Sequence, residues 1–572
     1  MKKKFYILLI FFIILLSILF ENKNVVISDN TKISGDFSEN ANEISQKSGD
    51  IQDKYDDISQ TSGDLKYTSE DNSSNSGENS TSKEPSSVSI KFDTVPETLQ
   101  NFRYQIQPAN NYSNNINLSG TSNYNNIKGI STFRGNNYRN NAFYGCLTIN
   151  ENKLQKIWTN TIGQTDNWTG VGWNGQPAII MWDDDVKKQM NIYDEFKQKE
   201  NFTEVIYGTL DSHIHFYDLD SGLPTRDSIK VESSIKGSVT IDPRGYPLLY
   251  VGQGINEVSG ESVRFGYHIF SLIDGKELCF INGRDKFAYL GWGAFDGNPV
   301  IDSATDTMIL PGENGIIYIV KLNTNYDKAN AQISISPKIT KYRYTQNGKA
   351  GGTENSITIY KNYAFFINNT GLLQCLDLNT LTPVWTYKME DDCDATIGLE
   401  EENGELFLYA ACEIDRRTQD DLAYIKKING RTGKVIWEYS CACKYDASVN
   451  GGVLSSPIVG ENNISDLVIY SISKTTSLRT GKLVALNKKD GTIAWEKDLT
   501  AYSWSSPVAA YTKSGEAYII FADSYGIIHL INGKTGETLY TLQTRWWKFR
   551  RFTSNFLQPY NHRKQRKTYF QN

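Results

Sequence analysis

Leu-Ser-Ser-Pro-Ile-Val (454–459), Leu-Val-Ile-Tyr-Ser-Ile-Ser (467–473), Gly-Lys-Leu-Val-Ala-Leu-Asn (481–487) and Asp-Gly-Thr-Ile-Ala-Trp-Glu (490–496) form the stretch that decides the fold. Each run is short and rich in residues that favour β-strands, and Gly, Asp or Asn turns separate the runs. Their lengths and spacing are those of one four-stranded antiparallel sheet. Residues 454–495 therefore predict a single β-sheet unit.

The same unit recurs along the chain. From Pro457 to Pro507 the offset is 50 residues, and 505–536 repeats the order of the four runs. Related segments lie upstream, at 205–222, 269–276, 314–323, 371–385 and 423–437. One such sheet cannot bury both of its faces alone, so a repeat of strands and turns with this period predicts radially arranged blades.

The repeat resembles that of the pyrroloquinoline-quinone-type β-propellers. The pattern, from Gly129 to Gln543, is Gly-x-(Ile/Leu)-x-(Ala/Cys)-Leu-(Asp/Asn)-x-x-(Thr/Asp)-Gly-x-x-x-Trp. This family contains quinoprotein alcohol dehydrogenases and also non-catalytic scaffolds similar to the propeller lipoprotein of the outer-membrane assembly machinery. The resemblance implies an all-β propeller, and it is specific for fold rather than function.

The composition excludes few functions. The chain has 572 residues, of which 39% are apolar and 12% aromatic, and its formal net charge is −6. No basic stripe interleaved with aromatic residues occurs in the repeats, so we expect no nucleic-acid partner. We expect one large propeller, monomeric, rather than several domains.

The N-terminal residues predict export. Three lysines at 2–4 precede the apolar run Phe5–Phe20, which is typical of a signal or membrane anchor, here residues 1–20. Ser17–Asn22 offers a poor cleavage site and contains no Cys, so we favour an uncleaved single-pass helix with the propeller outside the cell membrane. A cleaved signal would give a secreted protein. Residues 21–100 are polar and predict a disordered stalk.

An N-terminal arm, residues 101–153, should pack on the propeller at 154–543. Within the arm, Phe-Arg-Gly-Asn-Asn-Tyr-Arg-Asn (133–140) combines an aromatic residue, a Gly turn and two arginines. We interpret it as a plug that ties the arm to the propeller edge, with an anion site as the alternative. Leu154–Thr159 resembles an orphan outer strand that closes the ring by joining the last blade.

The cysteines and histidines predict no disulfide framework and no metal site. Seven cysteines are an odd and sparse set, which we interpret as small buried hydrophobic residues. Quinoprotein dehydrogenases usually carry a vicinal Cys-Cys ring, and the nearest approach here is Cys441-Ala-Cys443. His213 and His215 share one face of a predicted strand, but a third ligand is missing.

The tryptophans separate into two groups by their position in the repeat. One group follows the turn after the third strand and should pack between blades as structural residues: Trp158, Trp385, Trp437 and Trp495. The other group precedes inner strands and should gather at the channel mouth. With nearby polar residues it forms the predicted ligand-binding rim: Trp168, Trp173, Asn174, Trp292, Asp296, Asn298, Glu354, Asp394 and Trp504.

Two interpretations of this rim remain open. Trp, Asn and acidic groups on Gly-rich backbone suit the stacking and edge recognition of a sugar, peptide or quinone. Alternatively, Gly only allows the backbones to crowd the axis, and Trp covers the end of the core. We predict a non-catalytic binding or assembly module at the cell envelope, with a protein or cell-wall glycan partner and no cofactor. The alternative is a quinoprotein dehydrogenase that uses pyrroloquinoline quinone and Ca²⁺.

The repeat fails after Gln543, where residues 544–572 become strongly basic. Trp has a single codon, so Trp546-Trp547 read one base later gives Gly-Gly, and Phe552-Thr553 in that frame allows Ser-Pro. Gly-Gly followed by Ser-Pro is the pattern that leads into an inner strand at 451–457. Seven earlier points lead into inner strands, at 177, 238, 299, 356, 396, 457 and 507, and the shifted frame supplies an eighth. We therefore predict an eight-bladed propeller of four-stranded antiparallel blades and hypothesise that a frameshift has disrupted its last blade. A basic tail for an anionic polymer is the other interpretation.

Overall fold

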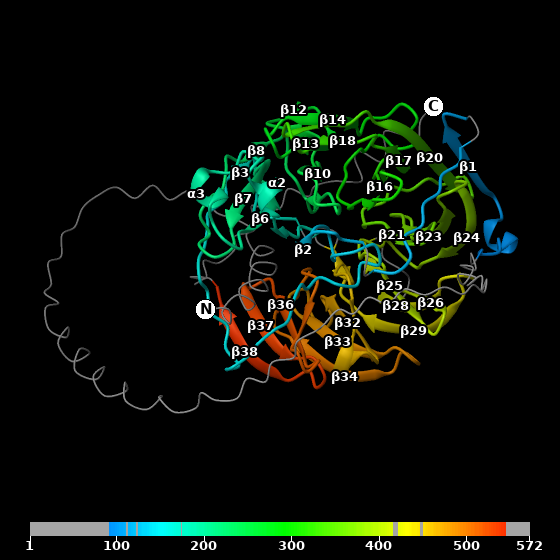
Figure 1. Ribbon diagram of the computed structural model, residues 1–572. Coiled ribbons are helices and arrows are strands. Elements are labelled where there is room, and N and C mark those ends of the chain that lie inside the picture. The colour runs from blue at the N-terminus through cyan, green and yellow to red at the C-terminus, as the bar shows by residue number, and fades with distance from the viewer. Residues whose placement is uncertain are drawn as a thin grey trace, which may run out of the picture. The chain divides into compact units, whose positions relative to one another are not determined.

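A computed structural model describes residues 91–544, except 110–111, 122–123, 173, 416–420 and 447–449. The described residues belong to one compact unit, and nearly all of its regular structure is antiparallel β-sheet. Seven sheets follow one another in chain order around this unit, as the colour sequence of Figure 1 shows. The predicted all-β propeller is confirmed.

Of the first three blades, blades one and three carry a fifth strand and blade two has four. Blade one contains β2 (Lys128–Ile130), β5 (Ala178–Met181), β6 (Thr203–Gly208), β7 (His213–Asp218) and β8 (Ile229–Lys230). Blade two contains β9 (Thr240–Ile241), β10 (Leu248–Gly252), β13 (Gly266–Ser271) and β14 (Glu277–Asn282). Blade three contains β15 (Val300–Asp302), β16 (Thr307–Pro311), β17 (Ile316–Lys321) and β20 (Lys338–Gln346), with β1 (Phe102–Gln107) on its outer edge.

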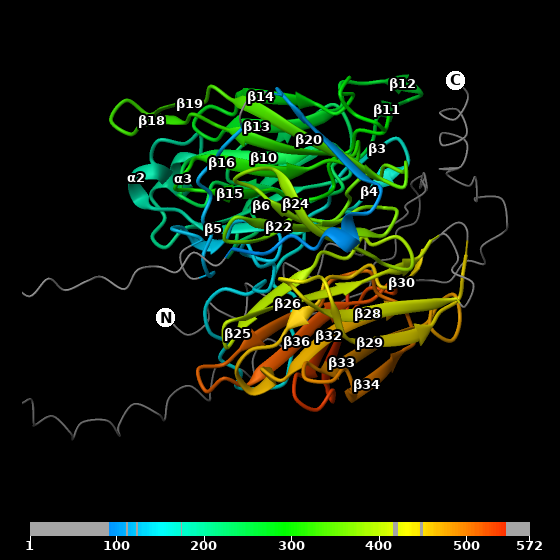
Figure 2. The same cartoon turned by 90° about the vertical axis from the view of Figure 1, so that its right-hand side faces the viewer.

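The remaining four blades are more regular. Blade four contains β21 (Thr358–Tyr360), β22 (Tyr363–Ile367), β23 (Leu372–Asp377) and β24 (Thr382–Lys388), and blade five contains β25 (Gly398–Glu402), β26 (Glu405–Ala411), β28 (Leu422–Asn429) and β29 (Val435–Ala442). Blade six contains β31 (Ile458–Val459), β32 (Leu467–Ser473), β33 (Gly481–Asn487) and β34 (Ile493–Leu499). Blade seven contains β35 (Val508–Tyr511), β36 (Ala517–Ala522), β37 (Ile527–Asn532) and β38 (Thr538–Gln543). Figure 2 shows β26, β28 and β29 side by side.

Short elements decorate the blades. They are the hairpins β3 (Gln164–Thr165) with β4 (Trp168–Thr169), β11 (Glu257–Val258) with β12 (Glu261–Ser262) and β18 (Asn325–Asp327) with β19 (Gln332–Ser334), the pair β27 (Glu413–Ile414) with β30 (Gly451–Gly452), the helices α2 (Asp184–Lys187) and α3 (Asp194–Lys197), and the 3-10 turns η1 (Pro96–Leu99) and η2 (Asn462–Ile464). One of them, the pair β27 and β30, extends the sheet of blade six through β32. None of the helices among the described residues has the length and apolar character needed to cross a membrane. The predicted anchor at 1–20 lies outside the described residues.

The core lies between neighbouring blades. Ile309 and Ile317 of blade three pack with Ala364 and Phe366 of blade four, and all four side chains are buried. Blades one and two, two and three, five and six, and six and seven share similar apolar clusters. Middle strands such as β16 and β22 are buried along their whole length, because both faces of each sheet are covered.

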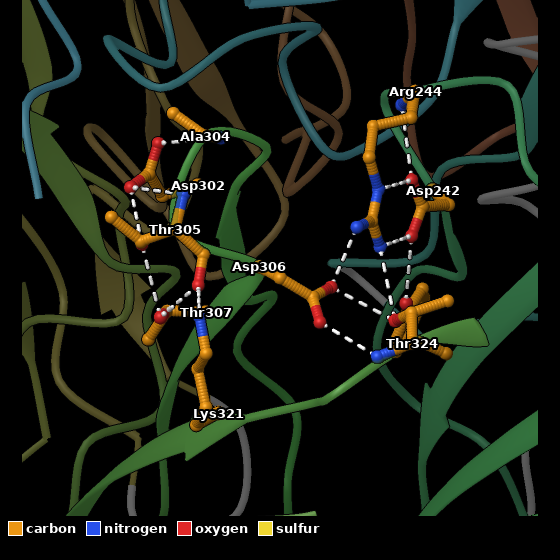
Figure 3. Close-up of polar contacts among 10 residues, drawn as sticks. Asp242, Arg244, Asp302, Ala304, Thr305, Asp306, Thr307, Lys321 and Thr324 are labelled. Atoms are coloured by element: carbon orange, nitrogen blue, oxygen red, sulfur yellow. Dashed lines mark hydrogen bonds and ion pairs between the residues drawn. The ribbon is translucent and has the colours of Figure 1, made fainter. Parts of the chain in front are cut away.

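Polar networks also join blades two and three on their turns (Figure 3). Arg244 donates to Asp242 at 2.7 Å and to Asp306 at 2.6 Å, and Thr324 donates to the same Asp306 carboxylate at 2.8 Å. Both Asp242 oxygens are used, since Tyr250 also donates to one of them at 2.9 Å. The buried Asp242 thus bonds only to groups of its own blade among these contacts, and it orients Arg244 towards Asp306 of blade three.

The structural tryptophans lie at equivalent places between blades. Trp385 of blade four, Trp437 of blade five and Trp495 of blade six each stack on a turn glycine of the following blade. Their indole N–H groups donate to a carbonyl three residues before that glycine, at 3.1, 2.9 and 3.1 Å. Trp158 does the same at blade one, with Gly222 beneath its ring and a 3.0 Å bond to Leu219.

The predicted plug lies along the inner strands rather than at the propeller edge. Residues 132–140 bond to inner-strand or neighbouring groups of all seven blades. The acceptors include the carbonyls of Pro299, Ile357, Leu399, Pro457 and Pro507. Arg134 and Arg139 are buried, and desolvation lowers the pKa of each guanidinium to about 10. Because both arginines donate their N–H groups to backbone carbonyls, the structure does not favour the alternative of an anion site.

Three boundaries differ from the sequence prediction. Residues 91–100, assigned to the stalk, pack on blade four instead, where Phe92 stacks on Tyr363 with ring centroids 3.9 Å apart. Leu154–Thr159 is not a strand: Leu154 packs against blade seven and Trp158 against blade one, without a β-ladder. The prediction of eight blades is wrong for the described residues, which form seven, and 545–572 lies outside them.

Candidate functional site

One face of the ring collects polar side chains because of strand direction. In an antiparallel blade, the segment that leads into the first strand and the turn between the second and third strands lie at the same end. Trp292 and Asp296 occupy such a lead-in segment before β15, and Glu313 occupies the turn between β16 and β17. Their contacts with residues that lead into blades one, two and four define what we call the mouth: Trp168, Lys236, Trp292, Asp296, Glu313 and Glu354.

Two tryptophans flank a lysine in the mouth. The Lys236 ammonium lies 5.7 Å from the Trp168 ring centroid and 5.9 Å from that of Trp292. It also lies 3.8 Å from a carboxylate oxygen of Asp296. Both rings are half-buried, so each keeps surface exposed to a ligand. The arrangement shows that these rings can hold a cationic group.

Three carboxylates converge below this lysine. Oxygen atoms of Asp296, Glu313 and Glu354 lie within 4.8 Å of one another. Asp296 is 1% exposed and Glu313 3% exposed, while Glu354 is half-buried. Trp292 donates its indole N–H to Glu313 at 2.7 Å. One remaining Glu313 oxygen and both Asp296 oxygens have no hydrogen-bond partner among the described residues.

A second acidic group lies on blade five and its lead-in segment. Oxygen atoms of Asp392, Glu413 and Asp415 also approach within 4.8 Å of one another. Asn450 donates to both Glu413 oxygens at 3.0 Å, so this group has an internal donor. Asp394 lies between the groups, since its charge interacts with Glu354 and Asp296 on one side and with Asp392 and Asp415 on the other.

Burial disfavours the charged form of these acids. Desolvation is the main cause that raises the pKa of Asp296, and it raises the pKa of Glu313, Asp394 and Glu413 well above the usual value. Neighbouring carboxylates add to the shift for the last three. The close approach of these acids therefore disfavours their ionisation together, and a cationic group bound beside them would favour their charged forms.

The other predicted rim residues lie apart from this centre. Asn298 donates to Ser238 and Thr240, which makes it part of the inner-strand scaffold. The Asn174 carbonyl accepts a 2.5 Å bond from Ser238, and Trp504 packs on Tyr502 in blade seven. Trp173 lies outside the described residues. The structure thus brings together Trp168, Trp292, Asp296, Glu354 and Asp394, but not the whole predicted rim.

Sequence reasoning missed Glu313, Glu413 and Asp415, and it left Lys236 and Asp392 out of the rim although both lie in lead-in segments. Glu313 and Glu413 follow second strands, whereas the prediction considered only lead-in segments. The rule of strand direction was a usable signal, because it places both kinds of segment at one end of a blade. The sequence pattern does not show which blades bring their acidic side chains within reach of each other.

A quinoprotein dehydrogenase, the alternative function, would need Ca²⁺ and pyrroloquinoline quinone, and the residues of the mouth suit the first better than the second. The oxygen-only donor set of Asp296, Glu313 and Glu354 suits a hard divalent cation such as Ca²⁺. The thiols do not suit a quinone held at the mouth, because Cys441 lies in the outer strand β29, next to its last residue, and Cys443 follows that strand. The histidine pair is explained locally, since His215 contacts Asp211 at 3.1 Å and His213 contacts the Asp211 carbonyl at 2.7 Å.

Comparison with known proteins identifies the repeat. Residues 369–545 match the profile of the family described as outer membrane protein assembly factor BamB, which confirms the predicted repeat there. Similar solved structures include BamB from Moraxella catarrhalis, with 15% identity, 60% of this chain and 83% of that chain covered, and a TM-score of 0.37. No curated protein matches the chain significantly.

Two dehydrogenase structures are also similar. A quinohemoprotein alcohol dehydrogenase, ADHIIG from Pseudomonas putida HK5, has 12% identity, 75% of each chain covered and a TM-score of 0.47. A europium-containing methanol dehydrogenase has 12% identity, 69% of this chain and 89% of that chain covered, and a TM-score of 0.43.

Proposed function

As a β-propeller of the PQQ-like repeat family, the chain is, we propose, a non-catalytic binding or assembly module of the cell envelope whose partner docks on the mouth. The observation that carries this proposal is the pair of half-buried rings, Trp168 and Trp292, around Lys236 above buried carboxylates. Large aromatic rings with charged neighbours are typical centres of binding energy at interfaces. The family profile, named for an outer-membrane assembly factor, favours a protein partner.

The envelope location rests on the sequence of residues 1–20. A cationic flank and an apolar run support an uncleaved anchor with the propeller outside the membrane. Protease treatment of intact cells tests this placement, because an external propeller is digested without lysis. Protection of the propeller until the cells are lysed contradicts it.

Binding at the mouth is tested with the full-length chain immobilised on beads. Purified cell-wall glycan and a defined detergent extract of envelope proteins serve as separate probes. We expect Trp168→Ala and Trp292→Ala to reduce capture of one probe at least about tenfold, since each removes stacking surface. Leu223→Ala is the matched control, because Leu223 is an exposed apolar residue (55%) in the turn between β7 and β8.

The outcomes separate the possible partners. Selective loss of protein capture supports an assembly module, and selective loss of glycan capture identifies a wall-binding protein. Unchanged capture of both probes by both tryptophan variants, with unchanged thermal melting, contradicts docking at the mouth.

A quinoprotein dehydrogenase is the second candidate, because three buried or half-buried carboxylates at the mouth suit a cation. Bound pyrroloquinoline quinone accepts the two electrons of an alcohol oxidation, but the thiol pair is misplaced for it. Addition of the quinone and Ca²⁺ to the full chain should give no dye-linked oxidation of alcohols. Oxidation that Asp296→Ala or Asp394→Ala abolishes would replace our proposal.

A further inference from the structure

Two cysteines lie close together at the end of the outer strand of blade five. Side chains two residues apart on a strand point to the same face, and Cys441 and Cys443 pack with Tyr439 and Tyr445 on the apolar cluster between blades five and six. The Cys443 N–H donates to the Asp421 carbonyl at 3.0 Å, so the backbone bonding to blade five continues through this residue. Two steps of extended chain place the two Cα atoms about 6.6 Å apart, which is within the range that a disulfide spans.

The two thiols differ in exposure and in their tendency to ionise. Cys441 is half-buried, whereas Cys443 is buried. The Cys443 thiol first, and then the Lys482 ammonium and the Tyr439 hydroxyl, lower the pKa of the Cys441 thiol to about 7 against the effect of burial. The contact with Cys441 and burial raise the pKa of Cys443. Near neutral pH Cys441 is therefore the thiolate nucleophile, and Cys443 is a protonated thiol beside it.

A cavity of about 660 Å³ adjoins the pair. It is lined by Asp421, residues 442–445, Ser477 and Leu478. Leu478 lies in the turn between β32 and β33 of blade six and is 45% exposed, so the cavity borders an apolar surface. Cavities of this size hold small molecules and short peptide segments. A compound that carries a disulfide can therefore lie next to the two thiols.

We propose that Cys441 and Cys443 form a redox-active thiol pair that reduces a disulfide. The Cys441 thiolate attacks one sulfur of the substrate, which forms a mixed disulfide and releases half of the substrate as a thiolate. Cys443 then loses its proton to solvent and attacks the Cys441 sulfur, which releases the second half and leaves a Cys441–Cys443 disulfide. In all, the pair gives up two electrons and two protons, and the substrate becomes two thiols. The reaction involves neither the mouth nor a quinone.

The test uses the full-length chain after reduction and removal of the reductant. Oxidised glutathione and a peptide dimer joined by one disulfide serve as separate probes, because they offer the same S–S bond in a small and in a larger substrate. We expect at least one probe to produce the Cys441–Cys443 disulfide, and mass spectrometry of proteolytic fragments detects it after alkylation of the other thiols. The faster probe identifies the size of substrate. Cys443→Ser should instead accumulate the mixed disulfide on Cys441, since the second thiol is missing.

Cys279 provides a matched control, because it is also half-buried and lies on an outer strand, β14 of blade two. Burial, and then the charge of Glu277, raise the pKa of its thiol. At pH 7, iodoacetamide should alkylate Cys441 of the wild type at least about tenfold faster than Cys279, with a midpoint in the rate profile of Cys441 at a pH of about 7. Cys279→Ser should form the Cys441–Cys443 disulfide as the wild type does.

Two results would overturn the proposal. The first is alkylation of Cys441 at pH 7 no faster than that of Cys279, which needs no variant. The second is a mixed disulfide in Cys443→Ser at the exposed Cys146 but not at Cys441, with unchanged thermal melting.

Discussion

Arg139 is fully buried and uses all of its donor directions on main-chain and hydroxyl oxygens. It donates to the carbonyls of Phe133, Asn298, Pro299 and Ile357 and to the Thr132 hydroxyl, over 2.8–3.2 Å. Lysine has the same charge but lacks the planar fork that reaches several acceptors at once. The planar guanidinium, rather than its charge, therefore fastens the plug to blades three and four.

We expect Arg139→Lys to lower the free energy of unfolding by about 3 kcal/mol, since it leaves buried acceptors without donors. Urea denaturation measures the loss. The control is Arg264→Lys, at an arginine that is 43% exposed in its side chain and pairs with Glu232 at 3.3 Å and with Glu277. An exposed pair contributes at most about 1 kcal/mol, so equal losses in the two variants would contradict a role for the buried fork.

At this scale the sequence predicted part of the arrangement. The aromatic, Gly and Arg pattern at 133–140 indicated a plug, and the lead-in position of Trp292 and Asp296 indicated the mouth. The partners of the plug are backbone carbonyls, which no residue pattern encodes. Glu313 was missed for a related reason, since its role depends on a contact with Trp292 across a loop.

At the scale of elements, the packing of one blade on the next depends on a Trp and a Gly. Gly433 follows the third strand of blade five with φ +70°, and a Cβ there would stand 2.6 Å from the Trp385 ring. Gly404, between β25 and β26, has a similar φ of +78° but nothing within 4 Å. The two glycines share backbone strain and differ only in the space around them.

We expect Gly404→Ala to cost about 1 kcal/mol, from the left-handed backbone alone. Gly433→Ala should cost roughly 3 kcal/mol, because overpacking against the tryptophan adds to that strain. Chemical denaturation of the two variants measures the difference. If the losses are equal, the Trp–Gly contact does not set the spacing of the blades.

Strand positions were the most predictable elements. The seven lead-in points inferred at 177, 238, 299, 356, 396, 457 and 507 each precede an inner strand by one or two residues. The prediction of an outer strand at 154–159 was wrong, because that segment has no neighbouring strand to pair with among the described residues. Leu154–Thr159 has the composition of an outer strand, and its Trp158 packs like the other blade tryptophans, but the described residues provide no sheet for its backbone.

At the scale of the whole molecule, the acidic face makes stability depend on pH. Burial first, and then the charges of Asp394, Asp392 and Asp415, raise the folded-state pKa of Glu413, whereas the Asn450 bond lowers it. The folded protein therefore holds a proton on Glu413 that the unfolded chain has released. Between the unfolded and the folded pKa, stability falls as pH rises.

We expect the melting temperature of the protein to fall as pH rises from about 5 towards neutrality. Glu413→Gln should flatten this profile, since the amide keeps the shape of the side chain without the charge. Glu516→Gln should leave the profile unchanged. A Glu413→Gln profile parallel to that of the wild type would show that this carboxyl does not contribute.

The plug also has a consequence for biosynthesis. The Arg134 guanidinium donates at 2.8 Å to the Pro507 carbonyl, and 373 residues separate the two in the chain. The ribosome therefore makes the plug long before it makes the last acceptors. Contacts of such long range slow folding, and they leave unfinished strands exposed meanwhile. A nascent or prematurely terminated chain carries a complete plug with no ring around it. The propeller can therefore close only after the seventh blade has been made.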